Sequence, residues 1–69
     1  AAKMSEFLHK AGVPEGARPI FVNKNGEKVL VTGFDGMFPV ASLIKKDGTV
    51  SDQTQRRLYS SAEYQFVAE

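Results

Sequence analysis

Three Asx-Gly pairs, which begin at Asn25, Asp35 and Asp47, follow one another at intervals of ten and twelve residues. An Asx-Gly pair between apolar segments is a strong signal for a β-hairpin, because glycine adopts the left-handed backbone of a tight turn without strain. Turn signals repeated at this interval are typical of a β-meander. We therefore expect residues 19–68 to form successive antiparallel strands.

The first pair separates two apolar segments, residues 20–22 and residues 29–31. A two-residue loop would place Val22 opposite Val29, whereas a three-residue loop would place Val22 opposite Lys28. Because apolar cross-strand pairs stabilise a sheet, we expect the two-residue loop. Both faces of this hairpin then carry apolar side chains, one facing the core of the sheet and the other receiving a helix.

The last pair lies in the segment IKKDGTV, residues 44–50. Here a three-residue loop gives the better pairing, because it sets Ile44 opposite Val50 and leaves Gly48 in the left-handed conformation. We therefore expect this hairpin to be wider at its tip than the first one.

The middle pair lies in GFDGMFPV, residues 33–40, where large apolar side chains flank a short turn. Pro39 cannot donate a hydrogen bond within a sheet, so it is expected at an edge, a bulge or a bend. A bend at this point would curl the sheet and turn the corner inward. We therefore expect Phe38 in the core, and Phe34 either in the core or exposed as an anchor for a partner.

The N-terminal segment KMSEFLHKAG carries apolar residues at i, i+3, i+4 and i+7, from Met4 to Ala11. This spacing is typical of one face of an amphipathic helix. Gly12 suits the position after a helix end, and Pro14 prevents continuation. We expect a short helix over residues 3–11 that lies on the sheet, since so short a helix is marginally stable alone.

The C-terminal third of the chain is less regular. Residues 51–63 are polar and show no sustained period, so we expect a loop with a short strand or turn near Arg57–Tyr59. In the last segment, Tyr64, Phe66 and Ala68 alternate with other residues, which is typical of a half-buried strand.

Together these elements predict one α+β domain over residues 1–69. A short N-terminal helix packs on a strongly curved, mainly antiparallel sheet of about five strands, either SH3-like or a small open barrel. A chain of 69 residues has a small core, and we expect a free energy of unfolding on the order of 5 kcal/mol. The expected core consists of Phe7, Leu8, Ile20, Val22, Val29, Val31, Phe38, Val40, Leu43, Ile44, Val50, Leu58 and Phe66.

The composition narrows the classes of function. The chain has no cysteine, so neither a disulfide nor a thiolate metal site contributes to its stability. A net charge of +1 argues against a dedicated duplex-DNA binder, which normally carries a basic surplus. No apolar run reaches the roughly 18 residues of a membrane span, and no basic segment precedes an apolar leader. We expect a cytoplasmic or otherwise intracellular protein without a membrane partner.

Candidate catalytic residues are few. His9 is the single histidine and falls on the exposed side of the expected helix. The sequence contains no nucleophile elbow, no phosphate-binding glycine loop and no zinc-binding motif. We therefore expect no enzyme activity, no catalytic, cofactor or metal site, and no small-molecule substrate.

Arginine and tyrosine residues gather near the C-terminus, at Arg56, Arg57, Tyr59 and Tyr64. These residue types are enriched at the energetic centres of protein interfaces. We predict a non-catalytic module that binds a protein partner through this surface, with Phe34 as a further anchor.

Two alternatives stay open. A single-stranded nucleic acid would use Lys45, Lys46, Arg56 and Arg57 to hold phosphates and Tyr59 to stack a base. The other alternative is a structural or packaged protein of viral, phage-type origin that is released from a precursor by cleavage after glutamate. The small residues at the start and the ending VAE favour this second alternative.

Overall fold

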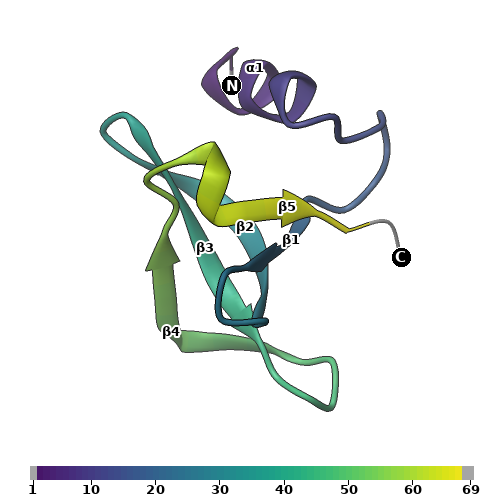
Figure 1. Ribbon diagram of the computed structural model, residues 1–69, viewed down its shortest axis with the longest axis vertical. Helices are drawn as coiled ribbons and strands as arrows, with labels where there is room; N and C mark the ends of the chain where they lie inside the picture. Colours follow the sequence, from purple (N-terminus) through teal and green to yellow (C-terminus); the bar gives the residue numbers. More distant parts are fainter. Residues whose placement is uncertain (1, 68–69) are drawn as a thin grey trace.

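The computed structural model describes residues 2–67 and contains one helix and one five-stranded sheet (Figure 1). A single 3-10 turn, η1 (Ser61–Glu63), precedes the last strand. The α+β class and the antiparallel sheet are therefore confirmed. The helix is α1 (Ala2–Lys10), and the strands are β1 (Ile20–Asn23), β2 (Lys28–Asp35), β3 (Phe38–Ile44), β4 (Val50–Arg57) and β5 (Tyr64–Phe66).

The strands follow the order β4-β3-β2-β1-β5, and every neighbouring pair is antiparallel. β1 to β4 form a meander, as the spaced turn signals predict. β5 returns to the opposite edge and pairs with β1. Over the described residues the sheet is therefore open, with β4 and β5 as its edges. Ala68 of the expected last strand and Glu69 of the expected cleavage site lie outside the described residues.

The β1–β2 hairpin differs in register from the expected one. Phe21 lies opposite Val29, and Val22 lies opposite Lys28. This register corresponds to a three-residue loop rather than a two-residue loop. The expected pairing of Val22 with Val29 is therefore wrong.

The reason for this register lies in Asn23, the last residue of β1. Its side-chain oxygen accepts hydrogen bonds from the backbone amides of Asn25 and Glu27, at 3.0 and 2.9 Å. A two-residue type I′ loop needs a positive φ at both central residues, but Asn25 does not have one. Gly26 does, with φ of +82°, and its amide donates to the carbonyl of Asn23. The Asn23 side chain thus favours the wider loop that ends in a left-handed glycine.

The β3–β4 hairpin matches its prediction. Ile44 lies opposite Val50, and Gly48 has a φ of +89°. The side chain of Asp47 accepts hydrogen bonds from the amide and the hydroxyl of Thr49, at 3.0 and 2.7 Å. These two hydrogen bonds stabilise the three-residue loop.

The helix α1 ends within one residue of its expected end. The amide of Val13 donates to the carbonyl of Leu8 at 2.9 Å, and the amide of Gly12 donates to that of His9 at 3.2 Å. With Gly12 at φ +80°, these two bonds form a Schellman motif. Val13 is buried, so the motif anchors the end of the helix against the core.

The core forms where α1 lies over one face of the sheet. The ring centroid of Phe7 is 5.5 Å from that of Phe21, 5.8 Å from that of Phe34 and 6.1 Å from that of Tyr64. Tilted and edge-to-face ring pairs of this kind add to the free energy of burial. Besides Pro39, the buried apolar residues of the described chain are Val13, Ile20, Phe21, Val29, Val31, Ala41 and Leu58.

The expected core is confirmed in part. Phe38 is 39% exposed, so its expected core position is wrong. In β1, Phe21 takes the central place expected of Val22, because a one-residue change of register exchanges the two faces of a strand. The confirmed residues are the buried Ile20, Val29, Val31 and Leu58 and the half-buried Phe7, Leu8, Leu43 and Phe66, which pack against the core. The other expected core residues, Val22, Val40, Ile44 and Val50, are half-buried but lie outside the core cluster.

β4 stands where a polar loop over residues 51–63 was expected. It pairs with β3, with Ser42 opposite Gln55 and Ile44 opposite Val50. The register of the two strands shifts between these two pairs. β4 is bent along its length (Figure 1). An edge strand needs backbone pairing on one side only, and its outer side chains stay polar. Hydrophobic periodicity therefore does not reveal this strand.

The corner at residues 33–40 is turned inward only in part. Phe34 is half-buried against α1, and Pro39, which lies opposite it as the second residue of β3, is buried. Met37 and Phe38 are exposed, at 84% and 39%. The expectation of an inward corner is therefore wrong for Met37 and Phe38.

Phe21→Ala should remove most of the stability of the fold. A buried Phe→Ala change costs about 3–5 kcal/mol, which is close to the whole free energy of unfolding that we expect. Phe38→Ala should cost less than about 1 kcal/mol, because its ring is partly exposed. Urea unfolding followed by circular dichroism measures both, and equal losses would contradict the faces assigned to β1 and β3.

Candidate functional site

An apolar surface lies at the turn between β2 and β3. Met37, Phe38 and Tyr59 are exposed by 84, 39 and 58%, and no other large apolar side chain of the described residues is exposed to this degree. The rings of Phe38 and Tyr59 lie edge to face, with centroids 5.0 Å apart. Single exposed apolar residues are ordinary, but a contiguous group is a feature of interaction sites. These three residues are termed the corner patch.

Two backbone features bring the corner patch together. A two-residue turn joins β2 to β3 and places Met37 at its tip. After β4, the amide of Leu58 donates to the carbonyl of Pro39 at 2.9 Å, which holds this segment beside the start of β3. Leu58 is buried, so the alternation of an extended chain directs the next residue, Tyr59, outward beside Phe38.

Arg57, the last residue of β4, lies next to the corner patch. Its Nη2 is 2.6 Å from Oδ2 of Asp35. Hydrogen bonding to the side chain of Tyr59 is the main cause that raises the pKa of Arg57 above its ordinary value, and the charge of Asp35 adds to it. Arg57 and Asp35 are each 55% exposed, so their ion pair orients the guanidinium more than it stabilises the fold.

A hollow of about 460 Å³ lies between the corner patch and α1. Lys3, Glu6 and Lys10 of α1 line one side of it. Lys3 Nζ donates to the carbonyl of Gly36 at 3.0 Å, which ties the start of the helix to the β2–β3 turn. An apolar centre with a charged rim is the usual anatomy of a protein interface.

The residues expected to bind a partner fall in different places. Arg57 and Tyr59 lie together at the corner patch. Phe34 and Tyr64 are half-buried instead, in the aromatic cluster around Phe7. The structure thus brings two of the expected residues together at the exposed surface and places two others under the helix.

Met37 and Phe38 belong to the exposed surface but were not expected there. One signal was available in the sequence. Met37 directly follows Asp35-Gly36, and a residue within a two-residue turn has no strand to pack against. Phe38 offered no such signal.

Arg56 lies on the other side of β4 and pairs with Glu27. Its Nη2 is 3.4 Å from Oε2 of Glu27, and its Nε donates to Oε1 at 3.5 Å. Glu27 also accepts a hydrogen bond from Asn23 Nδ2 at 2.9 Å. The hydrogen bond from Asn23, followed by that from Arg56, lowers the pKa of Glu27 below its ordinary value of 4.5. The positive charge of Arg56 is therefore engaged within the fold.

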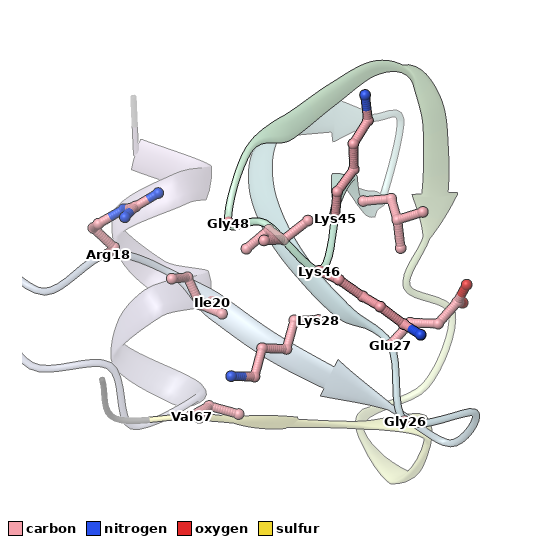
Figure 2. Close-up of a pocket in the computed structure, with 11 residues that line it drawn as sticks. Arg18, Ile20, Gly26, Glu27, Lys28, Lys45, Lys46, Gly48 and Val67 are labelled. Carbon is pink, nitrogen blue, oxygen red and sulfur yellow. The ribbon is translucent and has the colours of Figure 1, made fainter.

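Lys45 and Lys46 lie in the β3–β4 loop, at the opposite end of the sheet from the β2–β3 turn (Figure 1). They line a groove of about 650 Å³, which is termed the basic groove. Figure 2 shows this groove, which is lined by both basic and aliphatic side chains. Its other lining residues include Arg18, Ile20, Lys28, Ile44 and Val67.

Among residues 2–67, no group of three or more His, Cys, Asp or Glu side chains is arranged to hold a metal ion. His9 is exposed on α1. No helix in this part of the chain is long and apolar enough to cross a membrane.

Comparisons with protein-family models, with curated proteins and with solved structures find no match for this chain. The assignment of function therefore depends on the geometry and chemistry of the corner patch and the basic groove.

The free energy of unfolding should depend on pH through Glu27. Because the pKa of this carboxylate is lower in the folded chain, its ionised form stabilises the fold above the unfolded value, and this contribution is lost as the pH falls through the lowered pKa. Glu27→Gln should therefore be less stable than the parent near neutral pH, and the difference should shrink on acidification.

Urea midpoints of both proteins between about pH 7 and about pH 3 measure this difference. The carboxylate of Asp47, whose pKa is lowered chiefly by its hydrogen bond with Thr49, titrates in both proteins and cancels in the comparison. A difference in midpoint that stays constant with pH would contradict the role given to Glu27.

Proposed function

We propose that this protein is a non-catalytic interaction module that binds a protein partner through the corner patch and Arg57. The observation that carries the proposal is the pair of Phe38 and Tyr59, two exposed aromatic rings in contact with each other. Aromatic side chains beside an arginine are the residue types that dominate the binding energy of protein interfaces.

The way in which these side chains are held supports the proposal. Phe38 is the first residue of β3, and Tyr59 follows the buried Leu58. Arg57 is oriented by its ion pair with Asp35. Side chains that are already oriented lose less conformational entropy on binding, so more of their contact energy contributes to affinity.

We further propose that the sheet curves into an SH3-like, partly open barrel. Its support is the two register shifts in the sheet: β2 has an extra residue between Val31 and Gly33, and β4 has extra residues opposite the segment from Ser42 to Ile44 of β3. Shifts of this kind increase the local twist and curve a sheet. Curvature gathers strand ends and turns onto one surface, where a partner can reach them together.

A single-stranded nucleic acid is the second candidate partner. The exposed rings of Phe38 and Tyr59 favour it, because bases stack on such rings. The charge beside them weighs against it, since Asp35 offsets Arg57 where a phosphate would have to bind. We therefore rank a protein partner first.

Tyr59→Ala and Phe38→Ala should each weaken the binding of a protein partner at least about tenfold, because each removes a ring from the centre of the surface. The partner is first captured from the source cell on the immobilised protein and identified, and its affinity is then titrated against each variant. Gln53→Ala, a change at an exposed residue of β4 outside the corner patch, is the control and should leave the affinity unchanged. Retained affinity in both aromatic variants would contradict the proposal.

Salt distinguishes the two candidate partners. The affinity for a protein partner should change little between about 50 and about 300 mM salt, because apolar burial is not screened. If a thymidine oligonucleotide instead binds with an affinity that rises steeply as the salt concentration falls and that Arg57→Gln lowers, this result would assign the corner patch to nucleic acid.

A further inference from the structure

The basic groove combines aliphatic and basic side chains (Figure 2). Ile20 of β1, Ile44 of β3 and Val67 contribute aliphatic surface, and the amide of Val67 donates to the carbonyl of Ile20 at 2.9 Å. Ile20 is buried, whereas Ile44 and Val67 are half-buried and reachable by a ligand. The volume of about 650 Å³ lies within the range of ligand-binding clefts.

The charge of the groove differs from that of the rest of the molecule. Among the described residues its lining contains four basic residues, Arg18, Lys28, Lys45 and Lys46, against one acidic residue, Glu27, which gives a formal charge of +3 for this part of the lining. The sequence has nine basic and eight acidic residues, so the five basic and seven acidic residues elsewhere carry −2. A locally positive surface on a nearly neutral protein attracts an anionic partner.

Three lysines of the groove can reach such a partner. Lys28, Lys45 and Lys46 are exposed, and the ion pairs found within residues 2–67 involve none of them. Lys45 lies near enough to Asp47 to contribute to the lowered pKa of that carboxylate, but hydrogen bonds from Thr49 are the larger cause. Within this part of the chain, no ion pair therefore neutralises the charges of these lysines.

Glu27, the one carboxylate that residues 2–67 contribute to the lining, does not neutralise these lysines either. The oxygens of Glu27 already accept hydrogen bonds from Asn23 at 2.9 Å and from Arg56 at 3.4 and 3.5 Å. Its negative charge is thus directed toward β4. An incoming carboxylate would meet the lysines and not compete with Glu27 for them.

We propose that the basic groove binds an acidic peptide segment of a partner, with carboxylates at the lysines and an aliphatic side chain against Ile44 and Val67. No aromatic ring of the described residues lines the groove, so the bases of a nucleic acid would find no stacking surface there. A small inorganic anion would leave the aliphatic side chains uncovered. A peptide with acidic and aliphatic residues matches both parts of the lining.

This site is independent of the corner patch. The corner patch lies at the β2–β3 turn, whereas the groove lies beyond the other end of β3, at the β3–β4 loop (Figure 1). The result of a binding experiment at one surface therefore does not determine the result at the other.

The test is a titration of the whole protein with a defined probe, followed through the amide signals in NMR spectra. The probe is an acetylated and amidated peptide with two central leucines flanked by glutamates. We expect shifts at residues 44–49 and at Lys28. Raising the salt from about 50 to about 300 mM should weaken the binding about tenfold, because the lysines are exposed to solvent.

Two matched double variants test whether the lysines of the groove, and not the overall charge of the protein, bind the probe. The double variant Lys45→Gln/Lys46→Gln should weaken the binding of the probe about tenfold. The control Lys10→Gln/Lys24→Gln removes the same charge outside the groove and should weaken it less than about twofold. Val67→Ser should weaken it about threefold, since it removes part of the aliphatic contact.

Several outcomes would overturn the proposal. These are equal binding of a probe in which glutamines replace the glutamates, shifts confined to the corner patch, or no shifts up to about 1 mM probe. A thymidine decanucleotide or a vesicle of anionic phospholipid that binds in the groove more tightly than the probe would assign the groove to nucleic acid or to a lipid surface. Phe38→Ala should bind the probe as the parent does, which separates this result from the corner patch.

Discussion

The ring of Phe21 lies where the elements of the fold meet. It is 1% exposed, lies opposite Val29 of β2, and contacts Phe7 of α1 and Tyr64 and Phe66 of β5. The chain has no cysteine, so packing around this ring supplies the stability that disulfides supply in many small domains. The helix, the central hairpin and one edge of the sheet thus depend on one buried contact. The arrangement of both candidate surfaces follows from it.

The turn spacing and the helix could be predicted from the sequence because both are local signals. The register of the first hairpin could not, because it depends on the side chain of Asn23, whose hydrogen bonds to the loop outweigh the pairing of Val22 with Val29. β4 could not be predicted for a different reason. It is held by backbone pairing with β3, and polar side chains at a sheet edge leave no hydrophobic period to read.

The bulge in β2 explains why the candidate site was predicted only in part. The register of β2 against β3 shifts between Val31 and Gly33, because β2 has an extra residue there. Beyond such a bulge, the side chains of the strand point to the opposite faces from those that simple alternation predicts. Uninterrupted alternation would place Phe34 on the opposite face from Val31. With the shift, Phe34 instead packs on Phe7 under the helix. Phe38 lies on the outer face because side chains alternate along β3, where Pro39 and Ala41 are buried. The clustering of arginine and tyrosine was visible in the sequence, but the placement of Phe34 under the helix depended on this bulge.

A chain this small has room for two surfaces because α1 covers only one face of its sheet. β3 joins the two surfaces, since its first residue, Phe38, belongs to the corner patch and its last residue, Ile44, belongs to the basic groove. The forces at its two ends differ: apolar burial dominates at the corner patch, and screened charge dominates at the groove. Substitutions at one end should leave the other unchanged, because well-separated sites act additively. A substitution in the shared core would weaken both, since both strand ends are held in place by the packing around Phe21.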